Sequence, residues 1–255
     1  MIGKMLKCII VGMTTQLHSA EPTQVETVER GATRYLVWRV AKADLGRLQM
    51  HWLDTTGRPL ANFGGLRQHL ANQGLEVEFA TNAGIYERGP KPCGLTVCQG
   101  REVVALNLKK GEGNFYLKPN GVFFVDAEGA AGVLPAELYA SSGIKTRIAT
   151  QSGPLLIGAG VIHPAFNPNS KNLRQRSAVG VRKKDGQVIF VVTDRKDASK
   201  RTVSFHALAS FFLEMGCEDA LFLDGDISDF AVNPKPETVF TPQTYAAMFA
   251  LVRQR

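Results

Sequence analysis

Apolar and polar residues alternate with a period of two along much of the chain, and this period predicts strands. The alternation is clearest at residues 36–40, 48–52 and 75–79. Further strands are predicted at residues 95–98, 102–106, 114–117, 122–125, 146–150, 177–181 and 187–193. Turn signals such as Lys183-Lys184-Asp185-Gly186 join neighbouring strands into hairpins, so the sheet should be largely antiparallel.

Apolar residues at helical spacing predict three helices, at residues 63–73, 204–215 and 241–252. Gly216 supplies a left-handed stop to the second helix. In the third, Thr241 would be the N-cap, and the buried stripe would be Tyr245, Met248, Phe249 and Val252. Strands outnumber helices, so we expect an α+β fold: one mixed α/β domain with a largely antiparallel sheet and a few packed helices.

The composition fits a globular protein, with 255 residues, 44% hydrophobic and 21% charged. The formal net charge is +7, but Lys and Arg are scattered and no basic run reaches five residues. Solvated surface charge explains this pattern better than nucleic-acid binding does. No apolar stretch is long enough to cross a membrane, so we expect no transmembrane segment.

The N-terminus has the features of an export signal. Lys4 and Lys7 precede a mostly apolar stretch, and Ser19-Ala20 suits cleavage by a signal peptidase. We therefore predict a signal peptide at 1–20, a single domain at 21–255 and a periplasmic or secreted bacterial protein; the alternative is a frayed or first-strand N-terminus. In an oxidising compartment Cys93 and Cys98 could pair across a short loop.

The main candidate for chemistry follows an apolar run. Residues 220–223 are apolar and lead directly into Asp224-Gly225-Asp226-Ile227-Ser228-Asp229. Loops at the ends of rigid strands commonly hold functional groups, and three carboxylates in six residues could hold a cation or supply an acid or base. The run also suits a plain Asp-Gly turn, and it does not match an EF-hand loop.

Further polar or small residues lie at other predicted strand ends. The Asn82 amide could donate to a substrate oxygen, although Asn82-Ala83-Gly84 also suits a left-handed turn. Ser152-Gly153-Pro154 could let a ligand approach the backbone, or it could form a simple turn. Arg174 and Arg176 could grip a phosphate, or they could be surface charges. His163 lies in a long polar loop and is a further candidate for ligand contact.

Together these segments resemble the uncovering-enzyme-like phosphodiester glycosidase domain family, which has an exported bacterial branch. The matching segments are Thr81-Asn82-Ala83-Gly84-Ile85-Tyr86, Gly113-Asn114-Phe115-Tyr116-Leu117-Lys118-Pro119-Asn120-Gly121-Val122-Phe123, Ala149-Thr150-Gln151-Ser152-Gly153-Pro154-Leu155-Leu156, His163-Pro164-Ala165-Phe166, Arg176-Ser177-Ala178-Val179-Gly180-Val181 and Cys217-Glu218-Asp219-Ala220-Leu221-Phe222-Leu223-Asp224-Gly225. They lie within residues 75–232. Each motif is short, but their combination and spacing are specific.

The resemblance implies a hydrolase that cleaves glycosyl (sugar-1-phosphate) phosphodiester bonds on an envelope or extracellular glycan. Under it, Arg176 holds the phosphate, Asp224 does acid/base work and Asn82 contacts a sugar or phosphate oxygen. The sequence does not establish a second catalytic carboxylate, for which Asp194 and Asp226 are the candidates. The expected substrate-binding residues are Ser152, Gly153, His163, Arg195, Gly225, Asp226 and Ser228.

The sequence departs from the uncovering-enzyme branch, which carries three glycines and two serines after the aspartate. This chain keeps Asp224, Gly225 and Ser228 but has different residues between and after them. The alternative is therefore a non-catalytic glycan- or phosphate-binding envelope protein that retains the fold. A third hypothesis is a structural envelope protein without a small ligand. The expected partner is a phosphorylated glycan; no cofactor is required, and a divalent cation is left open.

Overall fold

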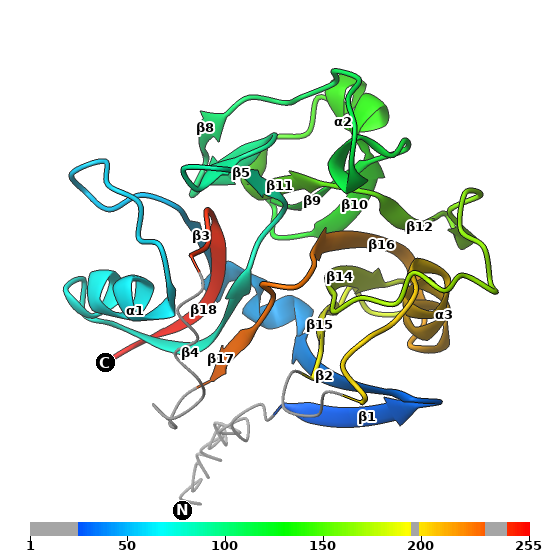
Figure 1. The fold of residues 1–255 in the computed structure, drawn as a ribbon. Coiled ribbons are helices and arrows are strands. Elements are labelled where there is room, and N and C mark those ends of the chain that lie inside the picture. The colour runs from blue at the N-terminus through cyan, green and yellow to red at the C-terminus, as the bar shows by residue number, and fades with distance from the viewer. Residues whose placement is uncertain (1–24, 195–198, 233–243) are drawn as a thin grey trace, which may run out of the picture.

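The structure, a computed structural model, describes residues 25–194, 199–232 and 244–255 (Figure 1). Its strands form three main sheets and a two-stranded hairpin, and every pairing among the described strands is antiparallel. The predicted α+β class is confirmed. The predicted signal peptide lies outside the described residues.

The three sheets have seven, five and four strands. In spatial order, the seven-stranded sheet contains β1 (Glu26–Arg30), β2 (Thr33–Val40), β15 (Val188–Thr193), β14 (Ser177–Arg182), β16 (Cys217–Asp224), β12 (Leu155–Gly158) and β13 (Val161–Ile162). The five-stranded sheet contains β10 (Ala131–Pro135), β9 (Gly121–Asp126), β11 (Thr146–Ser152), β7 (Thr96–Cys98) and β8 (Arg101–Val104). The four-stranded sheet contains β17 (Phe230–Val232), β4 (Leu75–Asn82), β18 (Met248–Gln254) and β3 (Leu48–His51), and the hairpin pairs β5 (Tyr86–Glu87) with β6 (Lys91–Pro92).

The described α-helices are α1 (Phe63–Ala71), α2 (Ala136–Ser142) and α3 (Phe205–Glu214), and two 3-10 turns are η1 (Lys42–Arg47) and η2 (Asn114–Tyr116). Side-chain caps fix two of the helix starts, because each satisfies a backbone N–H that has no partner inside the helix. Ser204 Oγ accepts from Ala207 N at 3.1 Å before α3, and Asn62 Oδ1 accepts from Gly65 N at 2.9 Å before α1.

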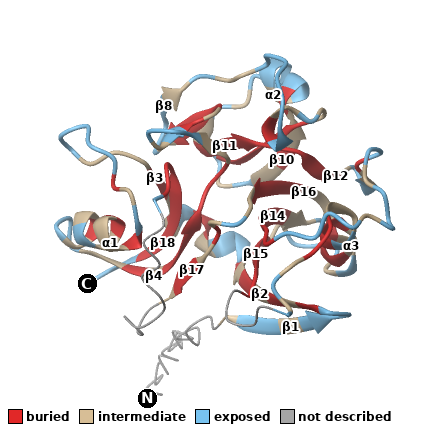
Figure 2. Ribbon diagram, viewed as in Figure 1, coloured by how far each residue is buried: buried red, intermediate tan, exposed pale blue. Residues whose placement is uncertain are grey.

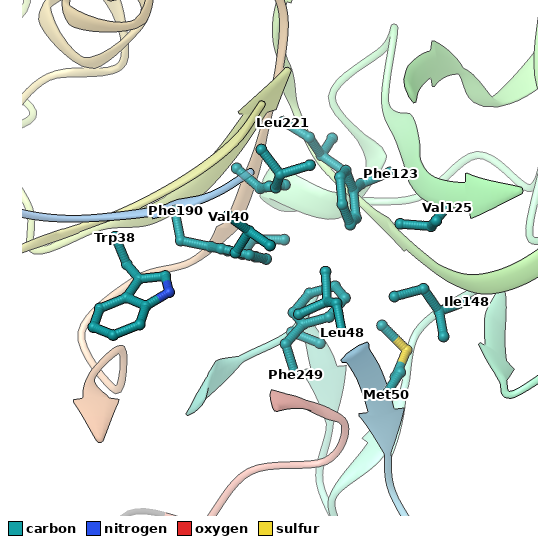
Figure 3. Packing of buried hydrophobic residues seen from close by; sticks show 14 of the residues in the cluster. Trp38, Val40, Leu48, Met50, Phe123, Val125, Ile148, Phe190, Leu221 and Phe249 are labelled. Atoms are coloured by element: carbon teal, nitrogen blue, oxygen red, sulfur yellow. The ribbon is translucent and has the colours of Figure 1, made fainter. Parts of the chain in front are cut away.

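One face of each main sheet contributes to a common hydrophobic core. Trp38 and Phe190 enter it from the seven-stranded sheet, Phe123 from the five-stranded sheet, and Leu48 and Phe249 from the four-stranded sheet (Figure 3). The rings interlock: the Phe190 and Phe249 centroids lie 5.2 Å apart, and those of Phe123 and Phe249 lie 5.6 Å apart. Burial of this apolar surface fixes the three sheets against one another.

A helix covers the opposite face of each sheet. Residues of α3 pack on the seven-stranded sheet, those of α1 on the four-stranded sheet, and Ala136 and Tyr139 of α2 on the five-stranded sheet. The central strands are therefore buried on both faces, whereas β1 at the sheet edge is largely exposed (Figure 2). This burial explains why several strands are continuous apolar runs rather than alternating ones.

The predicted helix at 241–252 is wrong where the structure describes it. Residues 241–243 lie outside the described residues, and Met248–Gln254 form strand β18 between β4 and β3. Its first five residues are all buried because both faces are covered. A doubly buried strand has no period of two, so its apolar run also matched a helical stripe.

The predicted strand at 114–117 is also wrong, because Asn114–Tyr116 form the turn η2. Gly113, which precedes it, has φ of +88°, a conformation that favours glycine. The Asn120 side chain then donates to the Phe115 carbonyl at 2.9 Å. This contact curls the segment back instead of pairing it with β9.

Two other predictions concern the cysteines and the membrane. Cys93, Cys98 and Cys217 carry free thiols in the structure, so it does not show the Cys93–Cys98 pairing. No helix within the described ranges is long and apolar enough to cross a membrane.

Candidate functional site

Strand ends from all three main sheets meet at one place. Asp224 ends β16, Ser177 begins β14 and the two residues are paired in register. Asn82 ends β4, and Ser152 ends β11. Residues 225–229 then carry the chain from the seven-stranded sheet to β17 in the four-stranded sheet (Figure 1).

Four polar residues at this place are joined by hydrogen bonds, and we call Asn82, Ser177, Asp224 and Ser228 the junction cluster. Asn82 Nδ2 donates to Ser177 Oγ at 3.0 Å, and Ser228 Oγ donates to the same oxygen at 2.8 Å. The Asp224 backbone N–H also donates to Ser177 Oγ, at 3.2 Å. Ser177 is therefore the hub that holds the three sequence-predicted residues together.

Asn82 is almost fully buried, and its amide is used within the protein. Besides Ser177, its Nδ2 donates to the Ala83 carbonyl at 3.1 Å, and its Oδ1 accepts from Asp229 N at 3.3 Å. Asn82 thereby ties the end of β4 to the loop after Asp224. Its direct contact with a substrate oxygen remains a prediction.

The Asp224 carboxyl has a raised pKa in the folded protein. Burial raises its pKa to about 6, and the negative charge of Asp226 adds to the rise, while a hydrogen bond from Gly225 N opposes it. That hydrogen bond to Asp224 Oδ1 is 2.7 Å long. Asp224 also contributes to the raised pKa values of Tyr86 and Cys93, after the larger effect of burial, so the β5–β6 hairpin lies beside it. A carboxyl with a pKa near neutrality can exchange a proton during a reaction.

Arg176 is a buried cation, with 2% of its surface exposed. Its Nε donates to the Val203 carbonyl at 3.0 Å, and its guanidinium carbon lies 3.5 Å from the centre of the Phe205 ring. Burial lowers its pKa to about 10. Among the described residues no carboxylate forms an ion pair with it, so its charge is only partly compensated and an anion would stabilise it.

His163 belongs to an aromatic stack that supports Arg176. Its ring stacks on Phe166 at 4.7 Å, and Phe166 stacks on Phe205 at 5.0 Å. Burial lowers the pKa of His163, and a hydrogen bond with the Lys118 backbone opposes this effect. The His163 Nδ1 accepts from Ala165 N at 3.1 Å. The geometry makes His163 part of the packing behind Arg176, and its contact with substrate remains a prediction.

The predicted pocket glycines differ in what surrounds them. A Cβ on Gly153 would lie 2.7 Å from both Asn120 Cβ and the Phe115 carbonyl, so packing against η2 alone requires glycine there. A Cβ on Gly225 would meet only the Gln175 carbonyl, at 3.6 Å. Ser152 Oγ donates to the Leu223 carbonyl at 2.9 Å, which links β11 to the end of β16.

The remaining predicted residues are dispersed. Asp226 is exposed beside the cluster, and its charge acts on both Asp224 and Arg176. The Asp194 carboxylate lies 3.6 Å from the Arg34 guanidinium. Arg195 lies outside the described residues. Within the described ranges, no three His, Cys, Asp or Glu side chains are grouped to hold a metal ion.

One hollow borders the junction cluster, and a second lies away from it. One, of about 260 Å³, borders the cluster and is lined by Leu173, Arg174, Gln175, Arg201, Thr202 and Asp226. The other, of about 400 Å³, lies against β3 and is lined by residues that include His51, Trp52 and His69. None of the sequence-predicted site residues lines the larger one.

Comparison with known proteins assigns the chain to a family. The family model for phosphodiester glycosidases matches residues 75–246. The chain belongs to the phosphodiester glycosidase family. It is 34% identical over 183 residues to the uncharacterized protein YigE of Escherichia coli (strain K12), covering 71% of this chain and 68% of that one.

Two solved structures share the fold of this phosphodiester glycosidase family member. The catalytic domain of zebrafish N-acetylglucosamine-1-phosphodiester alpha-N-acetylglucosaminidase, auto-inhibited by its pro-peptide, matches with a TM-score of 0.60 and 14% identity, over 92% of this chain and 85% of that one. A hypothetical protein from Synechocystis matches with a TM-score of 0.54 and 14% identity, over 90% and 61%.

Three residues near the cluster had no predicted role in this phosphodiester glycosidase family member. Ser177 is its hub, Gln175 donates to the Ser228 carbonyl at 3.2 Å, and the Tyr86 ring lies within electrostatic reach of Asp224. The available signal was the polar run Gln175-Arg176-Ser177 before an apolar strand, because buried polar residues need partners.

Proposed function

We propose that the protein hydrolyses glycosyl phosphodiesters, releasing a sugar and a phosphate monoester. The observation that carries this proposal is the Asp224 carboxyl, whose pKa is raised to about 6 in a member of the phosphodiester glycosidase family. Carboxyl groups with strongly perturbed pKa values cluster at functional sites. The zebrafish protein is named for N-acetylglucosamine, so that sugar is the first to test.

Asp224 acts as a general base in this proposal. Its carboxylate takes a proton from water as the water oxygen bonds to C1 of the sugar. The bond between C1 and the oxygen that bridges to phosphorus breaks, and its electron pair stays on that phosphate oxygen. The proton on Asp224 later passes to solvent. A phosphate leaving group is weakly basic and needs little protonation, so we assign Asp224 to the water rather than to the leaving oxygen. Turnover should then rise with pH through about 6.

Arg176 supplies the positive charge for the phosphate. Its partly compensated guanidinium gains an anionic partner when the diester binds, and this attraction is strong because the group is shielded from water. The stacked Phe205 ring and the Val203 carbonyl fix its orientation in advance. A group fixed in this way loses little entropy on binding.

Asn82, Ser177 and Ser228 have a positioning role in the proposal. Through Ser177 they fix the backbone on both sides of Asp224. Gly225, Ser152 and Gly153 shape the wall beside the carboxyl. The predicted signal peptide supports a periplasmic or secreted location, where envelope or extracellular glycans would be the substrates.

The test is turnover of the methyl diester of N-acetylglucosamine-1-phosphate, followed by phosphorus NMR as the diester signal converts to a monoester signal. Asp224→Asn should lower turnover by about 10²–10⁴-fold because it removes the base. Asp185→Asn, in an exposed hairpin, is the matched control.

Unchanged turnover in Asp224→Asn would remove Asp224 from the mechanism. If the wild-type protein binds the diester and its products but does not convert a panel of sugar diesters, the non-catalytic binding alternative replaces this proposal. Calorimetry on the same samples separates the two.

A further inference from the structure

The hollow of about 260 Å³ beside the junction cluster joins two segments that are distant in sequence. Leu173, Arg174 and Gln175 precede β14, and Arg201 and Thr202 precede α3. Asp226, from the loop after Asp224, completes the lining. The hollow thus shares a wall with the loop that follows the proposed base.

Hydrogen bonds to the backbone hold the two chain segments that carry the arginines of this hollow. Arg174 forms an isolated antiparallel bridge with Val203, with N···O distances of 3.2 and 2.8 Å. Thr33 Oγ1 donates to the Thr202 carbonyl at 2.9 Å and anchors the segment that carries Arg201. Both arginine side chains therefore extend from chain segments that hydrogen bonds hold in place.

Neither Arg174 nor Arg201 has an ion-pair partner within the described ranges, and no hydrogen bond from either side chain is present there. This differs from the arginines that pair with carboxylates elsewhere on the surface, namely Arg30, Arg34, Arg39, Arg47, Arg182 and Arg253. Two unpaired guanidinium groups facing one hollow are a binding arrangement for an anion.

The neighbouring charges also favour an anion. After the larger effect of burial, two neighbouring charges act on the pKa of Arg176: Asp226 raises it, and Arg174, with a smaller effect, lowers it. Among the described lining residues Asp226 is the one carboxylate, so the two lining arginines outnumber it. These residues therefore carry a net positive charge in spite of Asp226.

We propose that this hollow binds a second anionic group of the ligand whose phosphodiester reaches the junction cluster. The inference rests on the proposed function and narrows its substrate class to glycans or polyol phosphates that carry at least two anionic groups. Asp226 marks the boundary between the two subsites, because its charge acts on Asp224 and Arg176 while its side chain lines the hollow. One phosphate would face Arg176, and the next anion would face Arg174 and Arg201.

Calorimetry with two sugar-free probes, ethylene glycol bisphosphate and ethyl phosphate, tests this inference without any turnover. The wild-type protein should bind the bisphosphate at least about tenfold more tightly, because charge-assisted contacts form at both subsites. The double variant Arg174→Gln with Arg201→Gln should bring the two affinities together. The matched control is Arg58→Gln with Arg255→Gln, which removes the same charge from exposed positions outside the hollow and should keep the preference.

Equal binding of the two probes by the wild-type protein, or no binding of either at millimolar concentration, would overturn the inference. So would a preference that survives in the Arg174→Gln, Arg201→Gln variant, or one that the control variant also loses. The proposed function has a separate readout, which is hydrolysis of the methyl diester with its single phosphate. A protein that hydrolyses that diester but does not prefer the bisphosphate keeps the function and refutes the second subsite.

Discussion

The junction cluster and the hollow against β3 both contain a titratable side chain whose pKa is shifted against its charged form. At the cluster, burial raises the pKa of Asp224 to about 6. At the β3 hollow, burial lowers the pKa of His51 to about 4, and the neighbouring His69, whose ring centroid is 5.6 Å away, adds to the effect. The β3 hollow has the larger volume, about 400 Å³ against about 260 Å³ beside the cluster.

The difference lies in the charges around each group. Next to Ser177, the strand partner of Asp224, the protein buries Arg176 without a described carboxylate partner, which costs free energy unless an anion compensates it. His51 is neutral, and its Nε2 is 2.9 Å from Gln49 Oε1. Uncompensated charge, rather than volume, therefore distinguishes a candidate catalytic site from a surface hollow, and the following changes test that distinction.

The largest effect after that of Asp224→Asn is expected for Arg176→Met. Turnover should fall at least about a hundredfold, because the phosphate loses its buried charge partner. The free energy of unfolding should stay within about 2 kcal/mol of the wild-type value, since an apolar side chain escapes the desolvation cost. Urea denaturation and phosphorus NMR on the same samples check both values. Near-wild-type turnover would show that the cluster does not use this charge.

Gly225→Ala should lower turnover about tenfold, because a methyl group would occupy the approach to Asp224. A Cβ there has ordinary contacts with the protein, and φ of Gly225 lies outside the left-handed region, so the stability should be unchanged or slightly higher. Gly153→Ala is the contrasting variant, because its Cβ would clash at 2.7 Å and should destabilise the fold. Full activity in Gly225→Ala would place the ligand elsewhere.

Asp226→Asn should shift the pH profile rather than abolish activity. The charge of Asp226 contributes to the raised pKa of Asp224, so its removal should lower that pKa. The rising limb of log kcat/KM against pH would then move from about 6 to a lower pH. Asp185→Asn, in the exposed hairpin, should leave the limb in place. A limb that moves upward, or does not move, would assign it to another group.

The sequence indicated much of the cluster because its chemistry follows strand ends. Asp224 comes directly after an apolar run, Ser228 lies in the loop that continues from it, and Asn82 comes after an alternating run. For Ser177 the local signal was only its place in a polar run before an apolar strand, and its role as the hub depends on the register that pairs it with Asp224, 47 positions along the chain. Register between distant strands is set by the core and cannot be read from a local pattern.

The errors in the fold have the same origin. The strand β18 was predicted as a helix because sheet neighbours bury both its faces, and a local window contains no sign of those neighbours. The turn η2 depends on the Asn120 side chain, which bonds to the Phe115 carbonyl. By contrast α3 was predicted well, because its stripe, its Ser204 cap and its Gly216 stop are all local.

The smallest effect on activity is expected for His51→Gln, which should leave turnover within about twofold of the wild-type value because the β3 hollow takes no part in the chemistry. Its effect should appear in stability. Because burial lowers its pKa, His51 binds a proton more readily in the unfolded chain than in the folded protein. The free energy of unfolding of the wild-type protein should therefore fall by about 2 kcal/mol between neutral pH and pH 5. Denaturation at both pH values should show that His51→Gln escapes most of this loss.

The matching measurement on Asp224→Asn should have the opposite sign. Because its pKa is raised in the folded protein, the Asp224 carboxyl loses its proton at a lower pH in the unfolded chain. Asp224 therefore lowers the free energy of unfolding as pH rises from about 4 to 6, and this loss persists at higher pH. Asp224→Asn should therefore stabilise the protein at neutral pH and make little difference at pH below about 4. If His51→Gln instead removed activity, or if both variants gained stability at the same pH rather than His51→Gln at pH 5 and Asp224→Asn at neutral pH, the contrast between the two regions would fail.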